Sequence, residues 1–228
     1  MFPSTRWSLI AASRDSEGGK QQLEELCRIY RGSIQKFFSR YSVPGMETND
    51  VVQDFLLHGF EHDLFGRADR TTGSFRAYLV SAMRQHVGRL LEKHLAAKRG
   101  GGAAHESIQD EVLDPDSCLT AEELFDRAFV RDLMQRALES LRNLAVSRGK
   151  LAEFDQIERF LIEEPEPGDY ARIAASLGMK ANTVAVSVAR LRAKFKELVR
   201  NELRETVTSD SELRQEFSNL RLIQNDRA

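Results

Sequence analysis

Two short amphipathic segments joined by a glycine constrain the fold more than any other stretch of this 228-residue chain. They occupy residues 169–192, DYARIAASLGMKANTVAVSVARLR. Apolar residues from Tyr170 to Leu177 recur at i, i+3, i+4 and i+7, and those from Val184 to Leu198 recur at alternating spacings of 4 and 3. Both spacings predict helices with one buried face. Because glycine adopts the left-handed backbone conformation without penalty, Gly178 predicts the turn of a helix-turn-helix.

The second helix of this motif offers a face suited to the DNA major groove. Short amides and hydroxyls bind base edges and phosphates, small apolar groups contact thymine methyls, and basic groups contact phosphates. The candidate residues are Lys180, Asn182, Thr183, Val186, Ser187, Arg190 and Lys194. Residues 190–204 carry six basic and two acidic side chains, which favours contact with a polyanion. The alternative is an ordinary antiparallel helix pair with a solvated charged face.

The remaining helices are predicted from the same apolar period, at residues 20–41, 47–62, 74–98, 122–144 and 151–162. Charge is divided unevenly between them: residues 46–63 hold five acidic side chains and no lysine or arginine, whereas residues 84–100 hold five lysines and arginines and one acidic side chain. An acidic surface beside a basic one predicts two partners, one of them polyanionic.

Composition limits the class of protein. No apolar run approaches the roughly 20 residues that a membrane span needs, and the opening MFPSTRWSLIAAS lacks the pattern of a signal peptide. We therefore expect a cytoplasmic, all-α protein of two helical domains without a membrane contact. Cys27 and Cys118 have no metal-ligand spacing and are expected to be reduced.

The order of the motifs resembles that of bacterial extracytoplasmic function (ECF) sigma factors over nearly the whole chain. The motifs are ETNDVVQDFLLHGF at 47–60, GSFRAYLVSAMRQ at 73–85, a basic helix end, an acidic linker, and YARIAASLGMKANTVAVSVARLR at 170–192. The resemblance implies a sigma region 2-like domain at 1–99, a flexible linker at 100–119, a sigma region 4-like helix-turn-helix domain at 120–208 and a carboxy-terminal extension at 209–228.

The resemblance also implies the partners of each surface. The acidic helix would bind the clamp helices of the beta-prime subunit of core RNA polymerase through Asp50, Gln53, Asp54 and Leu57. The region 4-like domain would bind the beta flap and the minus thirty-five element of promoter DNA. The minus ten element would be bound by Arg67, Arg70, Arg76, Arg84, Gln85, Arg89, Lys93, Lys98 and Arg99. Phe75 and Tyr78 fit either base stacking or the core, and their helical spacing with Leu79 and Ala82 favours the core.

Some positions depart from the family pattern. Asn49 stands where an acid is frequent, and phosphorylation of the neighbouring Thr48 by a Ser/Thr kinase would restore negative charge there. Ala185 and Ser187 replace common basic residues. Leu213, Phe217 and Leu220 in the extension share one helical face, which leaves open whether this tail docks on either domain or is disordered. An anti-sigma protein is a further possible regulator.

Catalysis has little support in the sequence. No HExxH motif or phosphate-binding glycine loop is present, and His58 with His62 would bind zinc only with further ligands. We expect no enzyme activity, metal or cofactor. A stand-alone helix-turn-helix regulator is the alternative to a sigma factor, and it would bind duplex DNA tightly without polymerase.

Overall fold

The chain is all-α in the part that the structure, a computed structural model, describes, namely residues 19–68, 74–99, 119–204, 206–207 and 209–220. The helices are α2 (Gly19–Phe38), α3 (Thr48–Glu61), α4 (Phe75–Arg99), α5 (Ala121–Ser147), α6 (Leu151–Ile157), the 3-10 helix η2 (Glu158–Leu161), α7 (Asp169–Leu177), α8 (Ala181–Arg204) and α9 (Asp210–Asn219). Among these described helices, none has the length and apolar character required to span a membrane. The predicted linker at 100–119 lies outside the described residues except for its last position.

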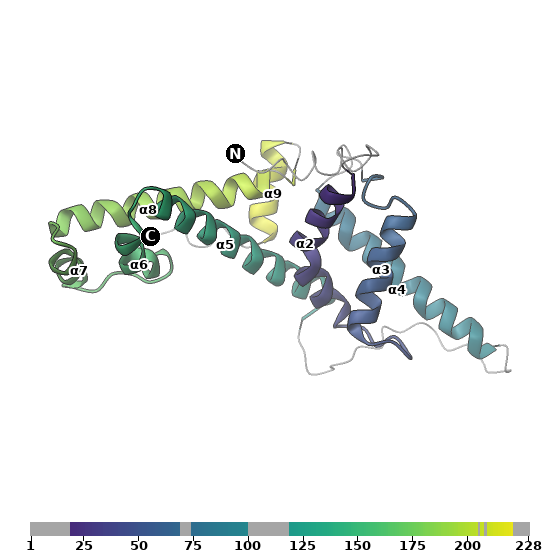
Figure 1. The fold of residues 1–228 in the computed structure, drawn as a ribbon. Coiled ribbons are helices and arrows are strands. Elements are labelled where there is room, and N and C mark those ends of the chain that lie inside the picture. The colour runs from purple at the N-terminus through teal and green to yellow at the C-terminus, as the bar shows by residue number, and fades with distance from the viewer. Residues whose placement is uncertain (1–18, 69–73, 100–118, 205, 208, 221–228) are drawn as a thin grey trace. The chain divides into compact units, whose positions relative to one another are not determined.

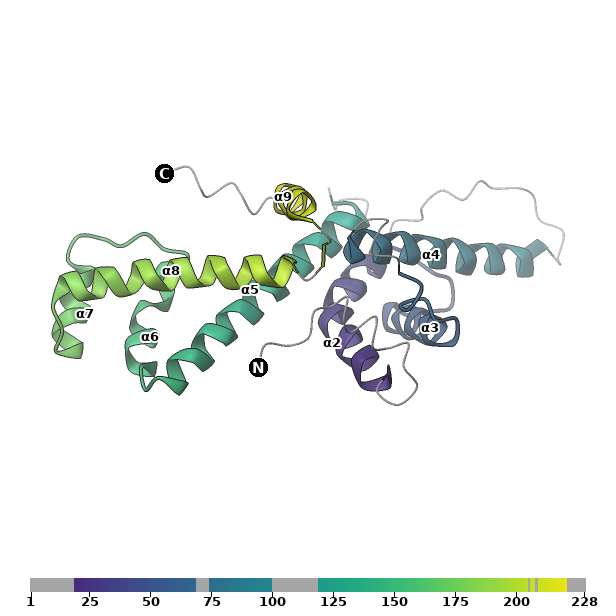
Figure 2. The ribbon, with the colours of Figure 1, turned by 90° about the horizontal axis from the view of Figure 1, so that it is seen from above.

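The chain divides into two compact units, with boundaries that differ from the predicted ones. Met1–Asp132 and Arg204–Ala228 form the first unit, and Leu133–Leu203 form the second. The amino-terminal part of α5 and the tail helix α9 therefore belong to the first unit, although the sequence had placed the whole of 120–208 in the second domain. Figures 1 and 2 show α2, α3 and α4 side by side within the first unit.

An aromatic core explains why the start of α5 belongs to the first unit. Tyr30 of α2 stacks on Phe129 of α5 with the ring centroids 5.7 Å apart, and it meets the Phe75 ring of α4 edge-on at 5.3 Å. All three rings are almost completely buried. Aromatic rings bury large apolar areas and dominate core energetics, so these contacts bind α5 to α2 and α4. Phe75 is thus a core residue rather than a surface for base stacking.

The tail helix α9 belongs to the first unit, where it buries apolar side chains and its Glu216 pairs with Arg76 of α4 at 2.9 Å. Leu213 and Leu220 are buried, and Ser209 caps the helix by accepting a hydrogen bond from the Glu212 N–H at 3.1 Å. Just before it, the carbonyl of Thr206 accepts a hydrogen bond from the Phe75 N–H at the start of α4. Of the alternatives left open for the extension at 209–228, docking on the first unit is the one observed for its described part, residues 209–220.

The second unit contains the predicted helix-turn-helix. Ile157, Phe160, Ile173, Ala174, Val184 and Val188 form its buried core, with Tyr170, Leu177 and Leu191 packed against it. Gly178, at φ 66°, ends α7 in the left-handed conformation, as the sequence predicted. Figure 1 shows α7 at the amino-terminal end of α8.

Candidate functional site

One stripe of α3 is exposed along its whole length. Asp50, Gln53, Asp54 and Leu57 follow each other at i, i+3, i+4 and i+7, and all four are exposed, Leu57 to 56%. The opposite face of the helix is buried through Val51, Val52, Phe55 and Gly59. The buried face fixes the rotation of α3, so the stripe presents two carboxylates, an amide and an apolar side chain in one line.

The first residues of α3 also have a structural role that the sequence reading did not include. The Asp50 carboxylate accepts a hydrogen bond from the Glu47 N–H at 3.2 Å, which forms half of a capping box. Asn49, at a position where ECF sigma factors often have an acid, accepts a hydrogen bond from Gln35 of α2 at 3.0 Å. Replacing Asp50 by alanine would therefore remove a cap as well as a charge.

The predicted minus ten residues are distributed over different surfaces. Gln85, Arg89 and Lys93 are exposed at i, i+4 and i+8 of α4, and Arg67 is exposed after α3. Arg84 is exposed and pairs with Glu122 of α5 at 2.5 Å. Arg70 lies outside the described residues, as do the side chains of Lys98 and Arg99 in the last turn of α4.

Arg76 has an internal role and is removed from the set of DNA-binding candidates. Its side chain is only 11% exposed, and its guanidinium pairs with Asp126 at 2.5 Å and with Glu216 of α9 at 2.9 Å. Burial alone would lower the pKa of Arg76, but the two carboxylates outweigh burial and raise it. A guanidinium already bound to two acids inside the fold is not available to phosphates.

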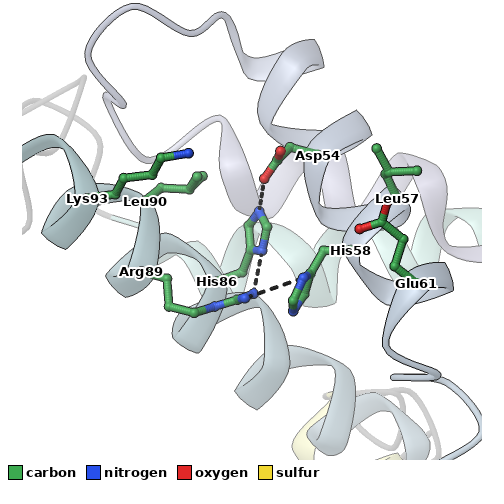
Figure 3. A pocket seen from close by; sticks show the side chains of 8 residues that line it. All are labelled: Asp54, Leu57, His58, Glu61, His86, Arg89, Leu90 and Lys93. Atoms are coloured by element: carbon green, nitrogen blue, oxygen red, sulfur yellow. Dashed lines mark hydrogen bonds and ion pairs between the residues drawn. The ribbon is translucent and has the colours of Figure 1, made fainter.

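A pocket of about 320 Å³ lies between α3 and α4 (Figure 3). It is lined by residues that the sequence assigned to different partners. From α3 come Asp54, Leu57, His58 and Glu61, and from α4 come His86, Arg89, Leu90 and Lys93. Both sets have the spacing i, i+3, i+4 and i+7, so each is one face of its helix. Candidate polymerase-binding and candidate DNA-binding side chains thus meet in one cavity, acidic on the α3 side and basic on the α4 side.

His86 lies at the centre of this pocket and was not predicted as a site residue. Its Nε2 lies 3.1 Å from Asp54 Oδ2, and its Nδ1 lies 2.9 Å from Arg89 Nη2 (Figure 3). Burial, together with the nearby Arg89 guanidinium, lowers the pKa of His86 to about 4, although Asp54 acts in the opposite direction. The ring is therefore neutral at pH 7. A histidine inside an apolar helical pattern carries no sequence signal that distinguishes it from a packing residue.

The exposed face of α8 matches the predicted recognition face in most positions. Lys180, Asn182, Thr183, Val186 and Arg190 are all exposed, whereas Val184 and Val188 are buried. An exposed valine between amides, hydroxyls and basic groups suits a groove lined with thymine methyls.

Ser187 and Lys194 face elsewhere. Ser187 Oγ donates a hydrogen bond to Glu153 of α6 at 2.5 Å, and Lys194 Nζ pairs with Glu197 at 2.8 Å. Both residues line a groove of about 200 Å³ within the second unit, between the end of α5, α6 and α8. The groove is lined by the apolar side chains of Leu141, Leu144, Phe154 and Leu191, by the basic side chains of Arg148, Lys150, Arg190 and Lys194, and by one acid, Glu153, which pairs with Lys150 at 3.6 Å.

Asp169 fixes the start of the helix-turn-helix. Its carboxylate accepts a hydrogen bond from the Glu166 N–H at 3.0 Å and pairs with Arg159 at 3.0 Å and with Arg172 at 3.3 Å. The backbone hydrogen bond, followed by the arginines, lowers the pKa of Asp169. The ionised side chain at the first residue of α7 also suits the positive end of the helix dipole.

Comparison of the chain with known protein families, with curated proteins and with solved structures found no match. The described residues contain no group of three or more histidine, cysteine, aspartate or glutamate side chains placed to hold a metal ion. The functional interpretation therefore depends on the surfaces described above.

Proposed function

We propose that the chain is a sigma-type initiation factor that binds core RNA polymerase and directs it to promoters. The observation that carries the proposal is the exposed stripe of α3, because its four side chains are those that the ECF resemblance assigns to polymerase. Leu57, 56% exposed at the end of the stripe, adds an apolar side chain to the two carboxylates and the amide. The helix-turn-helix of the second unit supplies a matching DNA-binding surface.

The α3 stripe would contact the clamp helices of the beta-prime subunit. Asp50 and Asp54 would attract and align the partner, since complementary charge mainly raises the association rate and fixes the register. Leu57 would supply the apolar anchor, because few interface residues carry most of the binding energy and they bury apolar surface.

The two DNA elements would be contacted by different units. In the first unit, Arg67, Gln85 and Lys93 would hold the minus ten strand by its phosphates, whereas Arg89 contacts His86 and His58. Opening the strands costs a few kcal/mol, and the capture of unstacked bases would offset that cost. In the second unit, the exposed face of α8 would enter the major groove of the minus thirty-five element.

The groove of the second unit suits a further polymerase contact. Its lining of apolar and mainly basic side chains is complementary to a short amphipathic segment that carries acidic residues, and the resemblance assigns such a contact to the beta flap. Control by an anti-sigma protein, or by a kinase acting on Thr48 at the start of α3, stays a prediction.

The test is binding of the purified chain to bacterial core RNA polymerase, measured by fluorescence anisotropy with a label on an introduced surface cysteine. Asp54→Asn and Leu57→Ala should each weaken binding, Leu57→Ala by about tenfold if it is an anchor. Asp50→Asn is preferred to alanine because the amide oxygen still caps α3. Glu24→Gln, an exposed acid of α2 in the same unit, is the matched control and should bind as tightly as the original chain.

A second measurement distinguishes a sigma factor from a stand-alone helix-turn-helix regulator. The holoenzyme should initiate at promoters that the chain alone binds weakly. Absence of core binding, combined with tight sequence-specific binding of duplex DNA by the chain alone, would replace the sigma proposal by a stand-alone regulator.

A further inference from the structure

A buried histidine connects the exposed α3 stripe to α4. Only 3% of the His86 side chain is exposed, and its ring meets those of Phe55 at 5.3 Å and Phe38 at 6.0 Å edge-on. A site that needed only packing would favour an apolar side chain, because a buried polar group costs free energy unless it has partners. Both ring nitrogens of His86 do face charged groups, Asp54 and Arg89.

The partners determine which nitrogen carries the proton. A guanidinium donates hydrogen bonds and cannot accept them, so Nδ1, 2.9 Å from Arg89 Nη2, must be the acceptor. In the neutral ring the proton then resides on Nε2. That nitrogen is buried without a well-aligned hydrogen bond, and Asp54 Oδ2 lies 3.1 Å away.

The contact with His86 uses only one oxygen of the Asp54 carboxylate. Its side chain is 48% exposed, so one carboxylate oxygen faces His86 while the other can still accept a hydrogen bond from outside (Figure 3). Fixing an exposed side chain before a partner arrives removes part of the entropic cost of ordering it on binding.

We propose that His86 is a positioning residue, which holds the Asp54 carboxylate in the orientation that the partner docked on α3 requires. The inference rests on the proposed function, because the partner is the clamp of core RNA polymerase. Arg89 acts on Asp54 only indirectly, because its hydrogen bond to Nδ1 fixes the tautomer of His86. The Arg89 guanidinium also contacts His58 Nδ1 at 3.4 Å.

Two substitutions separate positioning from packing. His86→Phe fills the space between the two phenylalanine rings but removes the donor, whereas His86→Gln packs less well but has an amide N–H near the position of Nε2. Positioning predicts that His86→Phe lowers the affinity for core polymerase by about fivefold, the equivalent of about 1 kcal/mol, and that His86→Gln stays within about twofold of the original chain. A packing role predicts the reverse order.

The assay includes controls for the proposed function. Circular dichroism and thermal melting first establish that both variants are folded. In an Asp54→Asn background, His86→Phe should cause no further loss, because the carboxylate that it positions has gone. If Asp54→Asn weakens core binding while His86→Phe does not, His86 has no positioning role. If Asp54→Asn itself has no effect, the docking site is refuted and the role of His86 falls with it.

A spectroscopic measurement tests the geometry without polymerase. The imidazole nitrogens of the ¹⁵N-labelled chain at pH 7, assigned by comparison with His86→Gln, should show His86 as the neutral tautomer protonated at Nε2. Arg89→Gln should perturb that signal, because the glutamine carbonyl can accept a hydrogen bond and so no longer requires Nδ1 to be unprotonated. Protonation at Nδ1, or a charged ring, would overturn the inference even if polymerase binding is intact.

Discussion

Acidification to pH 5 should destabilise the first unit through His86. The unfolded ring takes up a proton near the ordinary pKa of 6.5, whereas burial and the Arg89 guanidinium keep the folded ring neutral until about pH 4. Asp54 and His58 of α3 also face the ring, and of these only Asp54 opposes the effect. Between these two pKa values the unfolded state binds more protons, so the free energy of unfolding falls as the pH falls.

The size of the effect follows from the two pKa values. Each tenfold difference in proton affinity corresponds to about 1.4 kcal/mol, so the complete transition is worth about 3 kcal/mol. Most of this change has occurred by pH 5, where linkage gives a free energy of unfolding about 2 kcal/mol lower than at pH 7. With the side chain only 3% exposed, solvent screening reduces this little. Since small domains are stable by about 5–15 kcal/mol, the loss is easily measured.

Urea denaturation at pH 7 and pH 5, followed by amide hydrogen exchange in α3 and α4, would isolate the first unit. His86→Phe should remove about 2 kcal/mol of the pH dependence, because the phenyl ring does not titrate. His62→Gln, which replaces an exposed histidine at the end of α3, is the control for the loss of an imidazole elsewhere in the unit. Equal pH dependence in the original chain and in His86→Phe would refute the assigned burial of a neutral imidazole.

Three further changes test the packing of the first unit. Gly59→Ala would place a Cβ 2.7 Å from the buried Phe65 ring, so despite the helix propensity of alanine we expect a net loss of about 1 kcal/mol or more in urea denaturation. Gly88→Ala, with no atom within 4 Å of the new Cβ, should instead stabilise α4 by about 0.5–1 kcal/mol, and a loss would contradict the open space beside it. Glu216→Gln should cost about 2 kcal/mol and increase hydrogen exchange in α9, because Arg76 loses a buried ionic partner; unchanged exchange would show that the tail is not held there.

Helical periodicity predicted the secondary structure because each helix buries one continuous face. The expected helix at 47–62 is observed at Thr48–Glu61, and that at 74–98 at Phe75–Arg99. The least accurate part was 151–162, where the period of 3.6 gives way to the tighter η2 after Ile157. The local sequence also predicted the turn at Gly178, because the left-handed backbone conformation strongly favours glycine.

Contacts between distant residues had no such local signal. Arg76 and Glu216 are 140 positions apart, and nothing in the period of either helix indicates that they pair. The same applies to Ser187, which turns toward Glu153 of α6 rather than outward. A basic or polar side chain in the sequence indicates that a hydrogen-bond or ionic partner is needed. Whether that partner is a residue of the same chain or another molecule depends on how the helices pack.

The pocket between α3 and α4 follows from this combination of local and tertiary rules. Periodicity places Asp54 and Glu61 on one face of α3, and Arg89 and Lys93 on one face of α4. When the apolar sides of the helices pack, these faces become neighbours, and unlike charges stabilise that arrangement only modestly because the rim is solvated. The buried imidazole changes this balance, since it contacts Asp54 and Arg89 on opposite nitrogens in a medium where polar contacts are stronger. A partner that pairs with Asp54 would therefore meet a carboxylate that already contacts His86 of α4.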